Sequence, residues 1–136
     1  MGYDDSVKSL QRCAAALATI ALPLDALSQP VGRFRFAWAR DEGAEQCPDG
    51  PALAREVTRR LGRDPFVASL APSIEASVRR LQGRWVARIV VRDAFDAPIG
   101  TREFTSEADD CSAIASAVTL GVALSIDPEA ALRPPA

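Results

Sequence analysis

The fold is decided by residues 46–62, QCPDGPALAREVTRRLG, which contain the start, the apolar stripe and the end of one helix. Asp49 can accept hydrogen bonds from the free amides of a first helical turn, and Pro51 suits that turn because it has no amide to leave unpaired. Gly62 favours the left-handed conformation in which helices commonly end. The apolar side chains recur at helical spacing at Leu53, Val57 and Leu61. The stretch therefore predicts a helix with one buried face.

Four segments around this helix alternate apolar and polar residues, which is the period of a strand with one buried face. In the first of them, aromatic residues alternate with arginine and alanine at Phe34, Phe36 and Trp38. The last segment changes parity between Ile99 and Phe104, which predicts a β-bulge near Gly100. The predicted strands cover residues 31–40, 74–79, 85–92 and 99–104.

A second helix is expected from Cys111 to about Ile126, where small and branched apolar residues form a broad face. Asp109 and Asp110 precede it, and their negative charge is favourable at the positive end of the helix dipole. The pair Asp127-Pro128 is expected to end this helix, because proline cannot continue it.

The predicted elements follow in the order β-α-β-β-β-α. Short connections favour an antiparallel meander for the last three strands, while the first helix allows the first strand to lie beside a non-sequential neighbour. Each helix has one apolar face, so both are expected on one side of the sheet. The fold class is therefore α+β, a two-layer sandwich with a four-stranded, mostly antiparallel sheet. We expect this domain over residues 29–128 and a proline-containing tail or linker over residues 129–136.

Length and composition exclude several classes of function. A chain of 136 residues can bury the core of one domain without a metal, and a net charge of −2 gives no overall attraction to nucleic acid or anionic membrane. Histidine is absent, which removes Ser–His and Cys–His nucleophile pairs and imidazole ligands. Phosphate-loop and dinucleotide-binding glycine patterns are absent from the sequence as well. We therefore expect no catalytic residue, no cofactor and no metal site.

The amino-terminal segment resembles a signal peptide. Residues 13–24 form an uncharged run of the right length for its apolar core, too short to span a membrane. Ala26 and Ser28 place small residues where a signal peptidase reads them, so cleavage before Gln29 is expected. Residues 1–28 are interpreted as a signal peptide, which implies export to the periplasm or out of the cell. The alternative is a buried or amphipathic first helix of a cytosolic protein.

Removal of that segment would leave two cysteines, Cys47 and Cys111, each at the entry of a predicted helix. Helices that pack side by side on a sheet can bring such entries together if they start at the same edge. In an oxidising compartment the pair should form a disulfide. A disulfide that closes the long loop between Cys47 and Cys111 would stabilise the fold by about 4 kcal/mol. The alternative is a reactive thiol, because a helix amino terminus lowers the pKa of a cysteine.

Carboxylates gather at Asp109-Asp110 and at Asp93 and Asp96. Two neighbouring acids could perform acid–base hydrolysis or hold calcium. However, helix capping explains the first pair and turn formation explains the second. A hydrolase that uses carboxylates alone is therefore kept as an alternative function, and a cytosolic α+β domain with free cysteines as another.

The strand positions opposite the predicted core carry a series of arginines: Arg33, Arg35, Arg79, Arg88 and Arg92. Val86 and Val90 lie between them, so the surface is partly apolar. If the helices cover only the other face, this one could bind an anionic polymer, a peptide or a second protein. The aromatic residues fall on the core side, unlike those of RNA-binding sheets, and we expect no nucleic acid. The alternative is a solvated face without a partner, whose positive charge is reduced by Glu75 and Glu103.

Five short motifs carry a resemblance to a known family: Cys47-Pro48-Asp49, Arg63-Asp64-Pro65-Phe66, Val90-Val91-Arg92-Asp93, Asp109-Asp110-Cys111 and Ile126-Asp127-Pro128. The chain resembles uncharacterised amino-terminal domains of exported envelope proteins from high-GC Gram-negative bacteria, over roughly residues 31–128. That resemblance implies a following proline-rich linker, to which Pro134-Pro135 is similar, and often a membrane-associated β-rich region. More distantly, the strand–helix–meander order is similar to the amino-terminal domain of TolB, which lacks the cysteine pair. Neither resemblance implies a catalytic residue.

The sequence thus leads to one main hypothesis about function. We expect a non-catalytic periplasmic or secreted binding module of a cell-envelope protein, with no stable membrane span of its own. Its partner would be an unknown envelope protein or an anionic envelope polymer, bound through the arginine-rich face of the sheet.

Overall fold

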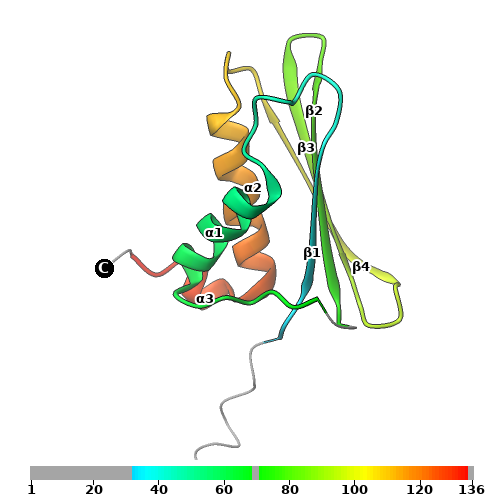
Figure 1. Ribbon diagram of the computed structural model, residues 1–136, viewed down its shortest axis with the longest axis vertical. Helices are drawn as coiled ribbons and strands as arrows, with labels where there is room; N and C mark the ends of the chain where they lie inside the picture. Colours follow the sequence, from blue (N-terminus) through cyan, green and yellow to red (C-terminus); the bar gives the residue numbers. More distant parts are fainter. Residues whose placement is uncertain (1–31, 69–70, 135–136) are drawn as a thin grey trace, which may run out of the picture.

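The computed structural model describes residues 32–68 and 71–134 (Figure 1). It confirms an α+β fold, a four-stranded sheet with the described helices packed against one face. The predicted signal peptide, residues 1–28, lies outside the described residues. The elements are β1 (Arg35–Arg40), α1 (Gly50–Leu61), β2 (Ser73–Leu81), β3 (Arg84–Arg92), β4 (Pro98–Ser106), α2 (Ser112–Ile126) and α3 (Pro128–Ala131).

The sheet has the strand order β1-β2-β3-β4. β1 is parallel to β2, and the other two pairs are antiparallel. The sequence allowed a non-sequential neighbour for the first strand, but β1 pairs with the next strand along the chain, and α1 supplies the crossover that this parallel pair needs. The first strand is also shorter than predicted, since Phe34 forms only an isolated bridge to Phe66. The predicted bulge is confirmed by the register shift that pairs Val91 with Gly100 but Arg92 with Pro98.

Helix α1 begins and ends where its sequence predicts. The Asp49 side chain accepts a hydrogen bond from the Ala52 amide at 2.8 Å. Gly62 adopts a φ of 76° and donates its amide to the Thr58 carbonyl, which closes the last turn. The predicted stripe is buried in full, at Leu53, Val57 and Leu61. This stripe faces the rest of the helix layer and β1.

Helix α2 is the central element of the helix layer, in contact with α1, α3, β3 and β4. It is apolar on almost every side, as expected for a helix covered on several sides. Gly121 allows it to approach the sheet closely, because a Cβ built there would lie 2.8 Å from Ile89 Cδ1 and Phe104 Cζ. The small residues of this helix therefore set the distance between the two layers.

The predicted tail over residues 129–136 is wrong at its start. Residues Pro128–Ala131 form α3, in which Ala130 and Ala131 are buried against α1 and α2. Asp127 accepts a hydrogen bond from the Ala130 amide at 3.1 Å, and Pro128 occupies the first turn. The same two residues that end α2 thus begin α3, because aspartate caps a helix and proline suits its first turn.

Candidate functional site

The face of the sheet away from the helices is uncovered by any described segment (Figure 1). We call it the open face. Strand β3 shows how the two faces differ: Trp85 and Ile89 point to the helices and are fully buried, whereas Arg88 is exposed. Val86 and Val90 share the open face with Arg88 and are half-buried. The alternation predicted from sequence therefore places arginine and valine together on one accessible surface.

The five arginines predicted for this surface do not form one patch. Arg79 and Arg88 lie on the central strands, β2 and β3, and Arg35 on the edge strand β1. Arg92 is engaged by the Glu75 carboxylate at 3.1 Å, and Arg33 lies outside the sheet, before β1. Two of the five, Arg79 and Arg88, are therefore central and exposed.

A hollow of about 200 Å³ lies around those two arginines and is lined by Asp41, Ser77, Arg79, Val86, Arg88 and Glu103. Arg79 is opposite Val86, and Arg88 is opposite Ser77 and Glu103, so the two guanidinium groups are diagonal neighbours across β2 and β3. Neither of them forms a hydrogen bond or an ion pair with another described residue. We call this feature the arginine hollow. Each of its two guanidinium groups can bind a carboxylate or phosphate by two parallel hydrogen bonds.

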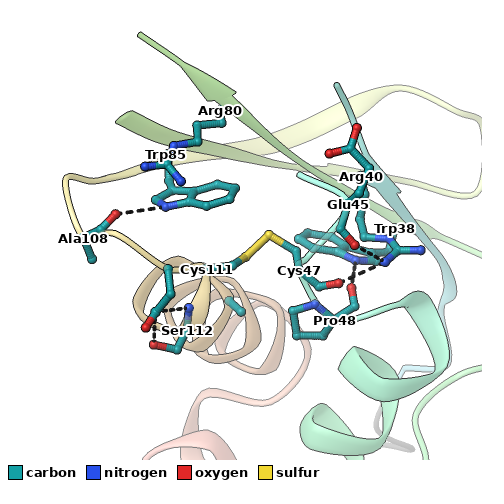
Figure 2. Close-up of a disulfide and its surroundings, with 12 residues drawn as sticks. Trp38, Arg40, Glu45, Cys47, Pro48, Arg80, Trp85, Ala108, Cys111 and Ser112 are labelled. Carbon is teal, nitrogen blue, oxygen red and sulfur yellow. Dashed lines mark hydrogen bonds between the residues drawn. A yellow bond between two sulfur atoms is a disulfide. The ribbon is translucent and has the colours of Figure 1, made fainter. Parts of the chain in front are cut away.

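The predicted disulfide between Cys47 and Cys111 is confirmed (Figure 2). The two Cα atoms lie 5.3 Å apart, and both residues are buried. The bond joins the loop before α1 to the start of α2, across 64 residues of sequence. Both sulfur atoms are therefore bonded, and neither is the reactive thiol that was the alternative interpretation of these cysteines.

Side chains that sequence reasoning missed hold the disulfide region in place (Figure 2). Arg40 donates hydrogen bonds to the carbonyls of Glu45 and Cys47, and Trp38 Nε1 donates to the Pro48 carbonyl at 2.8 Å. On the other side, Trp85 Nε1 donates to the Ala108 carbonyl, and the Arg80 guanidinium lies 4.8 Å from the Trp85 ring centre. The only signal in the sequence was the position of Arg40 and Arg80. Each is a charged residue at the end of a strand face that is otherwise apolar.

This region also positions one side of the arginine hollow. The loop that follows β1 contains Asp41, whose amide donates to the Val78 carbonyl at 2.8 Å. The same loop is buried at Ala44 and ends at the disulfide. Because the loop is fixed at both ends, Asp41 is held in the lining of the arginine hollow.

The carboxylates proposed from sequence have structural roles in several cases. Asp110 accepts hydrogen bonds from the Ser112 hydroxyl and the Ser112 amide, and these two bonds, in that order, lower the pKa of Asp110. Asp93 accepts from the amides of Phe95 and Ala97 and thereby forms the β3–β4 turn. By contrast, Asp41 and Glu103 are two acids that share one hollow.

Within the described residues, no three cysteine, aspartate or glutamate side chains are close enough together to hold a metal ion. In the same part of the chain, each helix is too short or too polar to cross a membrane. No family model, curated protein or solved structure matches this chain. Both resemblances, one drawn from short motifs and one from the order of the elements, therefore stay predictions.

Proposed function

We propose that this chain is a non-catalytic binding module of a cell-envelope protein, located in the periplasm or outside the cell. The open face of the sheet would bind a protein partner, with the arginine hollow receiving an acidic group of that partner. The observation that supports this most strongly is the pair Arg79 and Arg88, exposed at the centre of an uncovered sheet without an ion-pair partner among the described residues.

The composition of the open face is suited to recognition. Val86 and Val90 give it apolar area that is only half-buried in the free chain. The backbone that carries Arg79 and Arg88 is paired within the sheet, so binding has to order their side chains but not the strands. Arginine beside apolar area at the centre of a surface is a common composition of strongly contributing interface residues.

The distribution of charge favours a protein over an anionic polymer. Arg79 and Arg88 share their hollow with Asp41 and Glu103, and Arg92 is paired with Glu75. A uniformly negative polymer would be repelled by these acids as well as attracted by the arginines. A protein segment that carries an acid flanked by basic and apolar residues matches the mixed pattern better.

Export is supported by the disulfide, because such bonds persist mainly in oxidising compartments. The test is the amino-terminal sequence of the mature protein recovered from cells. A start at Gln29 agrees with export after cleavage. A soluble cytosolic protein that retains Met1 and has free Cys47 and Cys111 would overturn this part of the proposal and favour the cytosolic alternative.

Affinity capture from a cell-envelope extract tests the binding face. The wild-type chain is immobilised beside Arg88→Glu and, as a matched control, Arg55→Glu, which makes the same charge change on the exposed side of α1. We expect Arg88→Glu to lose a protein that both the wild type and Arg55→Glu retain. If the Arg88→Glu variant retains the same proteins, the proposal is wrong. If what it loses is a polysaccharide, the anionic polymer is the partner instead.

A hydrolase that uses carboxylates alone is the second candidate, since Asp41 and Glu103 line one hollow and two acids at one site can divide the roles of acid and base. This candidate predicts hydrolysis of an envelope glycan that is lost on Glu103→Gln. The hydrolase candidate is wrong if the chain leaves such glycans intact and if the Glu103→Gln variant binds the captured partner as well as the wild type does.

A further inference from the structure

The turn between β3 and β4 presents an aromatic side chain to solvent. Phe95 is 93% exposed, and Ile99, just beyond the turn, is 65% exposed. Ala94, Ala97 and Pro98 are exposed as well. We call residues 93–99 the Phe95 tip. An apolar cluster of this kind at the end of a hairpin is unfavourable in water and marks a contact surface.

The Phe95 tip is held in one conformation. The Asp93 carboxylate accepts hydrogen bonds from the amides of Phe95 and Ala97, at 2.8 and 3.0 Å. Asp96 has a φ of 67°, and its carbonyl accepts a hydrogen bond from Arg92, which is itself paired with Glu75. A rigid turn loses little entropy on docking, so its exposed phenyl ring is prepared for insertion into a pocket.

The helix layer at the same end of the molecule offers a pocket of matching chemistry. A hollow of about 580 Å³ lies between the end of α1 and α3, with Leu61, Ala130 and Pro134 among its apolar lining residues. Arg59, Arg60 and Arg133 line it too, and Glu56 is paired with Arg59. We call it the α1–α3 hollow. It is apolar and basic, whereas the Phe95 tip is apolar and carries two acids. The Asp96 carboxylate lies 3.9 Å from Arg92 Nε, and its side chain is still 79% exposed.

The β3–β4 turn and α3 lie at the same end of the molecule, in different layers (Figure 1). Two copies that meet by these ends can therefore exchange the same contact in both directions about one two-fold axis, the commonest symmetry of protein dimers. We propose that the Phe95 tip of one chain inserts into the α1–α3 hollow of a second copy, and that the resulting dimer contains two such contacts. This surface is separate from the arginine hollow, so the dimer leaves the open face of each copy available.

Sedimentation velocity of the mature protein recovered from cells, from micromolar to near-millimolar concentration, tests the dimer. We expect the wild type to shift from one copy to two. Phe95→Ser keeps the backbone amide that donates a hydrogen bond to Asp93, so the turn stays folded. The substitution should weaken association at least about tenfold. The matched control is Leu81→Ser, which removes an exposed apolar side chain from the β2–β3 end of the sheet and should leave association unchanged.

A mixing experiment separates insertion from a general loss of apolar surface. Arg133→Glu alters the α1–α3 hollow but keeps the tip, whereas Phe95→Ser alters the tip but keeps the hollow. Each variant alone should be mainly one copy, and an equimolar mixture should associate more strongly than either, since one intact contact can form.

Three outcomes would overturn the proposal. The wild type could stay a single copy at every concentration, Phe95→Ser could associate like the wild type, or the mixture could associate no better than its components. A chain that stays a single copy but binds phosphatidylethanolamine vesicles through Phe95 would likewise overturn it, and would assign the tip to a lipid surface.

Discussion

The two faces of the sheet are built from alternate residues of the same strands, yet they are specified in different ways. On the helix side of β3, Trp85, Ala87 and Ile89 are at most 1% exposed, and α2 approaches so closely that Gly121 has no room for a side chain. On the open face, arginine, glutamate and valine lie side by side and are exposed or half-buried. The helix-side face is specified by close packing, and the open face by its charged side chains. Stability and recognition should therefore respond to different substitutions, even between neighbours in sequence.

The largest difference is expected between Trp85 and its neighbour Val86. Trp85→Ala should lower the free energy of unfolding by about 5 kcal/mol, because it removes a fully buried ring and its hydrogen bond to the Ala108 carbonyl. Val86→Ala, on the open face, should cost about 1 kcal/mol or less. Urea denaturation measures both. Equal losses for the two variants would contradict the division between the faces.

Removing the disulfide should give the next largest effect. The double variant Cys47→Ser, Cys111→Ser should lose about 4 kcal/mol, because the unfolded chain is no longer constrained by a closed loop. Wild-type protein kept in reductant provides a second measurement of the same loss. The open-face variant Arg88→Ala should change stability by less than about 0.5 kcal/mol. A double variant as stable as the wild type would show that the bond does not hold the helix layer.

Gly121 tests how closely the two layers are packed. Gly121→Ala should cost about 2 kcal/mol, because the new Cβ would lie 2.8 Å from both Ile89 and Phe104 and their side chains must move. Gly100→Ala is the control, since a Cβ there would have no atom within 4 Å. Thermal unfolding should show a lower midpoint for the first variant alone. Similar midpoints would indicate a looser interface between α2 and the sheet.

The smallest effect is a pH dependence at the start of α2. The hydroxyl and amide of Ser112 lower the pKa of Asp110 below 3.8, so the native state favours the ionised form more than the unfolded state does. The resulting stabilisation is fully present above pH 3.8 and is lost as the pH falls through the lower native pKa. The stability difference between wild type and Asp110→Ala should therefore shrink on acidification.

Asp109→Ala is the matched control for this acid titration. The Asp109 carboxylate accepts no hydrogen bond within the described part of the chain, so its substitution removes a charge at the same helix entry but keeps both hydrogen bonds from Ser112 to Asp110. A difference between wild type and Asp110→Ala that grows as the pH falls would contradict the assigned cause.

Local patterns predicted most of the fold because the physical signals were local. The cap at Asp49, the left-handed Gly62 and the parity change at Gly100 are each decided by a few neighbouring residues. The signals failed where one motif had two uses, since Asp127-Pro128 both ends α2 and begins α3. They also failed for the neighbour of β1, which depends on how the chain crosses over α1 and not on the residues of the strand.

The candidate site was less predictable. Alternation placed Arg79 and Arg88 on the correct face, but it could not show that Glu75 engages Arg92 or that Arg33 lies outside the sheet. Those facts depend on strand register and strand ends. Asp41 lies outside every predicted strand and helix, and its place in the arginine hollow follows from the burial of Ala44 and from the disulfide at the far end of the loop that follows β1.

The helix layer packs on one face of the sheet, and we propose that the opposite face binds a protein. Site-specific photo-crosslinking in intact cells tests it most directly, with the crosslinking residue placed either at Thr101 on the open face or at Ala113 on α2, both exposed. The account predicts that the Thr101 position yields an adduct with a different protein and that the Ala113 position does not. An adduct from Ala113 alone, or none from either position, would contradict it.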